Sequence, residues 1–153
     1  MTSQIRQLST ADYPFVISVI DEWWGGRQMA DKLPRLFFEH FTDTSFAAER
    51  DGKLVGFLAG FISQSRPGEA YIHFVGVDPA QRGSGLGRLL YETFFQAAQA
   101  RGCVLVRAVT SPVTSTSWAS GAVCQTRTSF RAESGTGSGL FQTCGPPFWS
   151  HAP

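Results

Sequence analysis

Lysine is scarce in this chain, and no charge of either sign dominates it. Only Lys32 and Lys53 are present, and 13 basic side chains stand against 12 acidic ones, which gives a formal net charge of +1. Proteins that bind nucleic acids usually carry a basic stripe, and this composition does not supply one. No apolar run approaches the roughly 20 residues of a membrane span, and the first residues lack a signal-peptide core. We therefore expect neither a nucleic-acid partner nor a membrane partner.

Cysteine is also sparse. Cys103, Cys124 and Cys144 lie far apart and form no Cys-x-x-Cys pair. An odd number of cysteines without a pairing pattern argues against a disulfide framework and against a zinc site. We expect a cytoplasmic protein that holds no metal. Its 153 residues, 42% of them hydrophobic, suffice for one packed domain and are too few for two.

Charge is nearly absent from the last third of the chain. Residues 110–153 contain only three charged side chains, Arg127, Arg131 and Glu133, among many Ser, Thr, Gly and Pro residues. We expect one domain over residues 1–153, with a divergent tail at 110–153 and no full-length helix at 116–127. Two explanations of the tail stay open. It is either a divergent hairpin of residues 128–133 with 140–143, or an out-of-frame reading of a once-regular tail.

The apolar periodicity before this tail predicts an α/β fold. Apolar runs on both sides of Asp51-Gly52 predict antiparallel strands at 46–49 and 54–62 joined by a tight hairpin turn. A strand at 70–77 is apolar on both faces and is therefore expected to be central. The other expected elements are strands at 5–8 and 104–109 and helices at about 10–24 (capped by Ser9 or Thr10), 33–41 and 86–101.

A glycine-rich loop follows the expected central strand. It reads Arg82-Gly83-Ser84-Gly85-Leu86-Gly87 and leads into a helix. Glycines allow positive φ and a close approach of a ligand, and free amides at a helix N-terminus form an anion site. A Walker loop requires Gly-Lys-Ser/Thr at its end, and a dinucleotide fingerprint requires GxGxxG, so this spacing fits neither. It fits the form R/Q-x-x-G-x-G/A instead.

Placed directly after a strand that ends Val77-Asp78-Pro79, this loop resembles the acetyl-CoA loop of the GNAT superfamily of N-acetyltransferases. The resemblance covers residues 4–117. It implies a GNAT fold, a mixed and mostly antiparallel sheet flanked by helices and splayed at its central strands, with acetyl-CoA as the acetyl donor. The implied cofactor-binding residues are Val75, Gly76 and Val77 for pantetheine, and Arg82, Gly83, Ser84, Gly85, Leu86, Gly87 and Arg88 for the phosphates.

The same resemblance implies that the first two helices and their connection form the acceptor side of the cleft. Candidate substrate residues there are Trp23, Trp24, Arg27 and Phe38. For the aromatic residues, core packing at helical spacing is the competing interpretation. The helix that carries them could also form a homodimer surface.

The candidate catalytic residues are His73 and Tyr71. Strand alternation predicts that both lie on one face of the sheet together with Val75 and Val77. GNAT enzymes often place a carboxylate base at the position of Tyr71, and a tyrosine is no conventional base at neutral pH. Histidine titrates near neutral pH, so His73 is the candidate base, with a core histidine bonded to a backbone carbonyl as the alternative.

The tail departs from the family pattern where the general acid belongs. Ser111-Pro112-Val113 agrees with it, but Ser120 and Gly121 stand where an aromatic residue and a Tyr or His are usual. The acid is therefore unassigned. The expected function is acetylation of a primary amine, on a small molecule or a protein, by direct attack on acetyl-CoA. The alternative is a catalytically degenerate domain that binds CoA or another protein.

Overall fold

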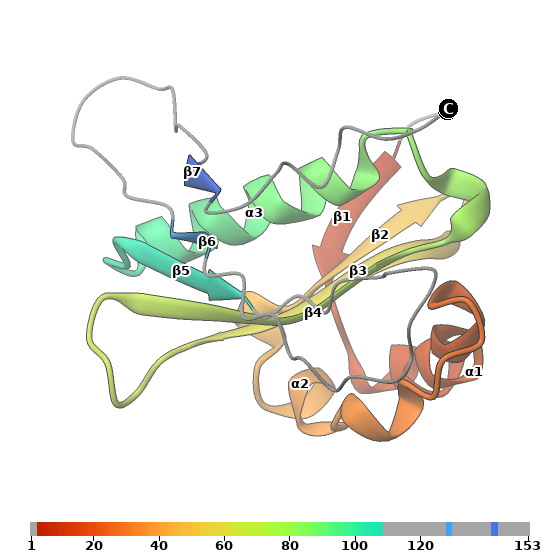
Figure 1. Ribbon diagram of the computed structural model, residues 1–153, viewed down its shortest axis with the longest axis horizontal. Coiled ribbons are helices and arrows are strands. Elements are labelled where there is room, and N and C mark those ends of the chain that lie inside the picture. The colour runs from red at the N-terminus through yellow and green to blue at the C-terminus, as the bar shows by residue number, and fades with distance from the viewer. Residues whose placement is uncertain (1–2, 109–127, 130–141, 144–153) are drawn as a thin grey trace.

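The computed structural model describes residues 3–108, 128–129 and 142–143 of the chain (Figure 1). Short 3-10 turns at Thr10–Asp12, Ala30–Lys32, Thr42–Thr44 and Pro79–Gln81 connect the larger elements. The strands are β1 (Ser3–Gln7), β2 (Phe46–Arg50), β3 (Lys53–Ile62), β4 (Glu69–Val77), β5 (Leu105–Ala108), β6 (Thr128–Ser129) and β7 (Gln142–Thr143). The helices are α1 (Tyr13–Trp23), α2 (Leu36–Glu39) and α3 (Leu86–Ala100). None of the helices in these ranges is long and apolar enough to cross a bilayer.

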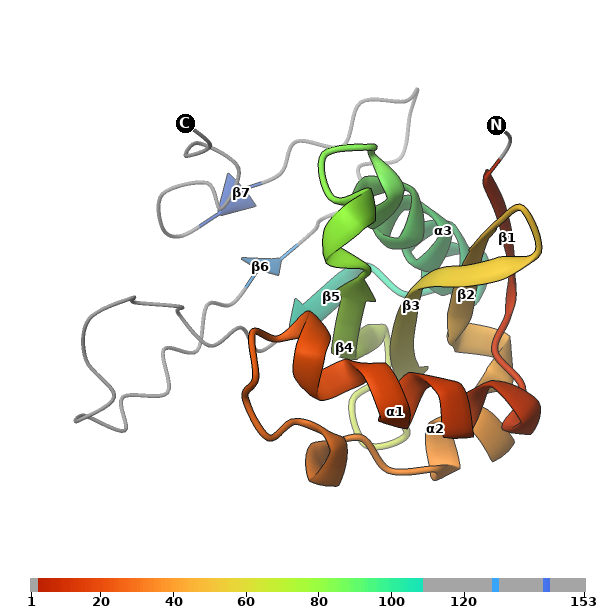
Figure 2. The same ribbon diagram turned by 90° about the vertical axis from the view of Figure 1, so that its right-hand side faces the viewer.

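The first five strands form one mixed sheet in the order β1-β2-β3-β4-β5. Neighbouring strands run antiparallel from β1 to β4, and β5 pairs parallel to β4. Helices α1 and α2 cover one face of this sheet, and α3 covers the other (Figures 1 and 2). The expected GNAT-type architecture, with a central strand at 70–77, is confirmed.

The β2–β3 hairpin turns where the sequence predicts. Asp51 (φ 52°) and Gly52 (φ 73°) both adopt the left-handed conformation that a two-residue hairpin turn favours. The turn sets a register in which Arg50 pairs with Lys53.

Two apolar cores hold the helices to the sheet. Residues four apart on α3, Leu86, Leu90, Phe94 and Ala98, are buried against one face. On α1, Val16, Ile20 and Trp23 are buried against the other face. The backbone of β3 approaches α3 closely, because a Cβ atom at Gly60 would lie 2.4 Å from Cε2 of Phe94.

The second helix is much shorter than the expected span of 33–41. Leu33 is extended, with φ −108° and ψ 93°, because a residue that precedes a proline disfavours helical geometry. The proline is Pro34, so α2 starts only at Leu36, and the prediction was wrong in extent. The first helix likewise opens with a 3-10 turn, with Ser9 at its N-cap as expected.

A bulge interrupts β4 in its middle. Ala59 of β3 pairs with Phe74, while the next residue, Gly60, pairs with Ile72. His73 is therefore an extra residue without a partner on β3. An inserted residue of this kind reverses the alternation of side chains beyond it.

The bulge overturns the expectation that four alternate residues of β4 share one face. Val75 and Val77 pack against the core beneath α3. The rings of Tyr71 and His73 instead contact aromatic residues on the opposite face, under α1 and α2. Simple strand parity fails here because it assumes unbroken pairing.

Beyond the bulge, β4 has only one neighbouring strand in the described part of the chain. β5 pairs with Glu69–Ile72, and residues 73–77 pair with β3 alone. This arrangement agrees with the expected splay of the central strands. It leaves one edge of β4 without a described strand partner next to the glycine-rich loop.

Part of the tail prediction falls on described residues. Thr128 pairs with Thr143, and Ser129 pairs with Gln142, as antiparallel strands. This agrees with the expected hairpin of 128–133 and 140–143. The expectation for 116–127 lies outside the described residues.

An ion-paired cluster joins the start of α1 to the sheet and predicts acid sensitivity. Arg6 donates to Asp12 through two nitrogens, at 2.7 and 2.8 Å, and to Glu49 at 2.7 Å. Burial alone would raise the pKa of Asp12, but the hydrogen bonds from Arg6 and Ser9 outweigh burial and lower it. The folded state therefore favours the ionised form of the Asp12 carboxyl group more than the unfolded state does. This contribution to stability is present above about pH 4 and is lost as pH falls through the lowered pKa.

We expect Asp12→Asn to flatten the acid side of the stability curve. Urea unfolding between pH 6 and pH 3 should show the wild-type protein losing more stability on acidification than the variant. An equal loss in both proteins would assign the acid sensitivity to other carboxylates.

Candidate active site

The glycine-rich loop presents free amides at the start of α3. Gly85 is the N-cap of this helix, with φ 82° and ψ 0°, and Gly83 has φ 79°. Apart from the chain neighbours, no described residue has an atom within 4 Å of a Cβ built at either position, so backbone conformation is the reason for glycine there. Within residues 3–108, the amides of Leu86, Gly87 and Arg88 donate to no backbone carbonyl. Amides without an acceptor at a helix N-terminus, together with the helix dipole, are the groups that bind phosphate in proteins.

The Arg82 side chain ties this loop to the acceptor-side helix. Its Nη2 donates to the backbone carbonyl of Trp23 at the end of α1. Gln81, its neighbour, accepts a hydrogen bond from Arg50 on β2. These two contacts within the protein hold the loop against the sheet and α1.

Arg88 lies on the solvent side of α3. It donates to Glu92 at 2.7 Å, and its side chain is 78% exposed. The hydrogen bond with Glu92 raises the Arg88 pKa. The guanidinium is therefore an exposed positive charge in the first turn of the helix.

Gly76 marks a close contact between the β4 edge and α1. A Cβ atom at Gly76 would lie 2.7 Å from Cη2 of Trp24 and 2.8 Å from Cε1 of Phe57. Trp24 also packs edge-to-face on Phe74, with ring centroids 5.5 Å apart. The tryptophan thus rests directly on the strand that carries Val75 and Val77.

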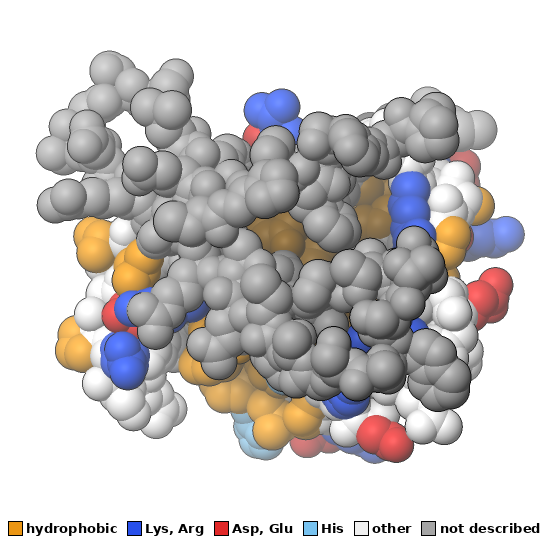
Figure 3. All heavy atoms as spheres, viewed as in Figure 1, with side chains coloured by type: hydrophobic (Ala, Val, Ile, Leu, Met, Phe, Trp, Pro, Cys, Tyr) orange, Lys and Arg blue, Asp and Glu red, His pale blue; other side chains and the backbone are white. Residues whose placement is uncertain are grey.

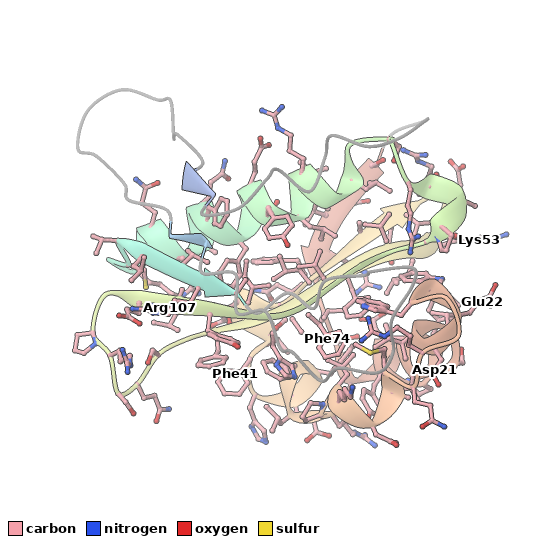
Figure 4. All side chains as sticks on the ribbon, in the orientation of Figure 1. Asp21, Glu22, Phe41, Lys53, Phe74 and Arg107 are labelled. Carbon is pink, nitrogen blue, oxygen red and sulfur yellow. The ribbon has the colours of Figure 1, made fainter. Side chains whose placement is uncertain are left out.

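The carboxylate of Asp21 ties the connection between α1 and α2 to α1. Oδ1 of Asp21 accepts from the amides of Met29 at 2.7 Å and Ala30 at 2.9 Å (Figure 4). This loop carries Arg27, which is exposed. The contact fixes the end of the loop relative to α1.

The structure separates the four expected acceptor residues into two groups. Phe38 is fully buried and Trp23 is 5% exposed, and both pack in the core under α1. Trp24 is half-buried and Arg27 is exposed. Of the four candidate substrate residues, only Trp24 and Arg27 therefore have side chains that an acceptor could reach from solvent.

His73 links the β4 bulge to the α1–α2 connection. Its Nε2 lies 2.9 Å from the carbonyl oxygen of Lys32, and its ring stacks on Phe37 with centroids 4.9 Å apart. A carbonyl oxygen only accepts, so the neutral ring carries its proton on Nε2. Nδ1 is then the proton-accepting nitrogen, and it forms no hydrogen bond with another described residue.

Tyr71 lies at the edge of a small pocket on the same face. Its ring stacks on Phe61, with centroids 5.4 Å apart and an interplanar angle of 29°. The pocket has a volume of about 240 Å³ and is lined by Phe61, Ser63, Arg66, Glu69, Ala70, Tyr71 and Arg107. Hydrophobic side chains also gather over the neighbouring helix α2 (Figure 3).

The charged residues of this pocket were not predicted from the sequence. Arg107 donates from Nε to Oε2 of Glu69 at 2.7 Å and from Nη2 to Oε1 at 3.0 Å. The hydrogen bond with Glu69 raises the pKa of Arg107. A signal was present in the sequence, because Glu69 precedes Tyr71 by two residues and Arg107 interrupts an apolar strand.

Free amides at a helix N-terminus, beside an open strand edge, define a site for a ligand with phosphates and an extended arm that can form backbone-type hydrogen bonds. The family model of the acetyltransferase (GNAT) family matches residues 3–117. The chain belongs to this family. Within the described residues, the amides that open α3 have no backbone acceptor, and residues 73–77 of β4 pair with β3 alone.

Curated relatives match over shorter stretches. The chain is 44% identical over 52 residues to an L-2,4-diaminobutyric acid acetyltransferase of Virgibacillus pantothenticus, which is 34% of this chain and 33% of the relative. It is 51% identical over 45 residues to a mycothiol acetyltransferase of Thermomonospora curvata, which is 29% of this chain and 14% of the relative. The matched stretches span less than half the length of these relatives.

Solved structures share the fold. The diaminobutyrate acetyltransferase of Paenibacillus lautus, in complex with L-2,4-diaminobutyric acid and coenzyme A, matches with a TM-score of 0.61 and 21% identity, over 72% of this chain and 67% of that one. Ard1 from Thermoplasma volcanium matches with a TM-score of 0.63 and 22% identity, over 74% of each chain.

Proposed function

We propose that this protein is an acetyl-CoA-dependent N-acetyltransferase that acetylates a primary amine of a small molecule. The observation that carries the proposal is the run of amides from Leu86 to Arg88, which have no backbone acceptor among the described residues, beside the edge of β4 that no described strand pairs with. Family membership supports the same activity.

The proposal gives the donor two contact regions. The amides that open α3, with the flanking glycines, bind the pyrophosphate, and Arg88 adds a positive charge nearby. The backbone of Val75, Gly76 and Val77 offers hydrogen bonds to the pantetheine amides along the open edge of β4. Acetyl-CoA supplies the acetyl group as a thioester.

On the acceptor side, His73 is proposed to take the proton that the attacking amine gives up. The hydrogen bond to Lys32 supports this role, because it fixes the tautomer in which Nδ1 carries the free lone pair. Tyr71 is proposed to contact the acceptor through its hydroxyl group. The sequence offers no assigned acid for the departing thiolate.

A small acceptor is favoured over a protein terminus. The pocket beside Tyr71 holds about 240 Å³, a size suited to a small amine. Named relatives that act on diaminobutyric acid and mycothiol support the same choice. A cytoplasmic location belongs to the proposal and is supported by the buried free thiol of Cys103.

Two measurements on the full chain test the proposal. Acetyl-CoA at about 100 times its Kd should raise the unfolding free energy by roughly 2.7 kcal/mol, seen as a higher Tm, whereas ATP and NAD should have no effect. A screen of amines should then release free thiol at a rate that depends on the amine. Stabilisation without thiol release would instead support the degenerate CoA-binding domain, and equal stabilisation by ATP would overturn the assignment of the loop.

A further inference from the structure

The pocket beside Tyr71 occupies a defined place on the sheet. Tyr71 of β4 pairs with Arg107 of β5, and the next pair, Ile72 with Ala108, is the last between these strands. The pocket therefore lies on the α1–α2 face, just before the point where the β4 edge opens. Figure 4 shows Arg107 over the adjoining ends of β4 and β5.

An ion pair forms one wall of the pocket. The side chains of Glu69 and Arg107 are 19% and 28% exposed, so both charges are largely withdrawn from water. The two hydrogen bonds from Arg107 engage both carboxylate oxygens of Glu69. Within the described residues, Nη1 of Arg107 donates to no group, so both N–H donors of this nitrogen have no partner there.

A second arginine, Arg66, shares Glu69 with Arg107, so the described residues that line the pocket carry one more positive charge than negative charge. Nη1 of Arg66 lies 4.0 Å from Oε1 of Glu69, and its side chain is 68% exposed. Two guanidinium groups thus stand against one carboxylate, which Arg107 already engages. Ser63 contributes a hydroxyl that accepts from the Arg66 amide at 3.1 Å and retains its own proton for donation.

The opposite wall is apolar. The stacked rings of Phe61 and Tyr71 form it, and Phe41 continues the aromatic surface at 5.6 Å from the Phe61 ring. A ligand that fits this pocket therefore needs an anionic end toward the arginines and a short hydrocarbon portion along the rings.

From these contacts we propose that the pocket is a carboxylate subsite and that the acceptor is an amino acid. Arg66, the free Nη1 of Arg107 and the Ser63 hydroxyl bind the carboxylate, as guanidinium donors bind planar anions. The carbon chain lies on Phe61 and Tyr71, and the reacting amine points toward the open edge of β4. The inference rests on the proposed function and adds the class of its acceptor.

The test compares amines that differ only in the carboxylate. L-2,4-diaminobutyrate is paired with 1,3-diaminopropane, and lysine with 1,5-diaminopentane. Isothermal titration of the full chain saturated with coenzyme A measures each Kd and does not require turnover. At least one carboxylate-bearing amine should bind at least about tenfold more tightly than its partner, the scale expected for a charge-assisted contact.

Variants of Arg66 connect this preference to the pocket. Arg66→Gln should remove the preference and leave the Kd of the decarboxylated partner unchanged, while Arg66→Lys should restore most of it. Arg101→Gln is the matched control, because Arg101 is a surface arginine at the end of α3 that pairs with Asp43 at 3.7 Å. It should keep the full preference.

Three results would overturn the proposed carboxylate subsite. The first is equal affinity within both pairs of amines, and the second is no binding of either carboxylate-bearing amine. The third is that Arg66→Gln weakens the binding of both members of a pair equally. A failure of the proposed function looks different, because it would show as absent thiol release while the binding comparison remains readable.

Discussion

Replacing Gly85 with valine is expected to abolish coenzyme A binding, with at least a 100-fold rise in Kd, and to leave the fold intact. Gly85 holds a φ of 82° as the N-cap of α3. A β-branched residue is strained in that conformation, so the first turn must rearrange and its amides no longer converge. The loss should appear in calorimetric titration and as a missing Tm shift with acetyl-CoA.

Gly102→Val provides the matched control. Gly102 also has a left-handed φ, of 78°, and apart from its chain neighbours no described residue has an atom within 4 Å of a Cβ built there. It follows the C-terminal end of α3, whereas Gly85 is the N-cap of the same helix. The control should lose comparable stability and still bind coenzyme A. Normal binding by Gly85→Val would show that this loop does not hold the phosphates.

Removing the imidazole of His73 is expected to lower kcat on the order of 100-fold, within the usual range for loss of a general base. His73→Gln is the informative change, because its amide NH₂ can still donate to the Lys32 carbonyl while no basic nitrogen remains. His73→Phe removes both. Steady-state kinetics should show the same loss of kcat in both variants, with the KM for acetyl-CoA nearly unchanged.

The two variants distinguish a role of His73 in proton transfer from a role in positioning the loop that contains Lys32. A glutamine variant with wild-type kcat, beside an impaired phenylalanine variant, would reduce His73 to a residue that positions the Lys32 loop.

Local signals allowed much of the fold to be predicted. Asp51-Gly52 has few alternatives to a tight turn, and the alternating glycines at 83, 85 and 87 can be read without knowledge of the rest of the chain. The predicted start of α2 was wrong, although the presence of Pro34 in the sequence indicates that the helix starts after it. That error came from weighing apolar spacing above the restriction on the residue before a proline.

Features that depend on pairing between distant segments could not be predicted. The bulge at His73 arises from the register between β3 and β4, which no local pattern encodes. The contact of Arg82 with the Trp23 carbonyl and the pair of Glu69 with Arg107 likewise join residues far apart in sequence. The glycine-rich loop at the start of α3 could therefore be predicted from the sequence, while the geometry around the acceptor side required the structure.

The close approaches at Gly76 and Gly60 limit how this sequence can drift over evolutionary time. On one face the indole of Trp24 occupies the space of a side chain at position 76, and on the other Phe94 occupies that of position 60. A methyl group at either glycine would require the neighbouring atoms to move. Natural variation at 76 should therefore be accompanied by smaller residues at 24 and 57, since atoms of Trp24 and Phe57 lie 2.7 and 2.8 Å from that Cβ position. Position 60 should stay glycine, because its Cβ would also lie 2.9 Å from the backbone carbonyl oxygen of Tyr71, which no substitution makes smaller.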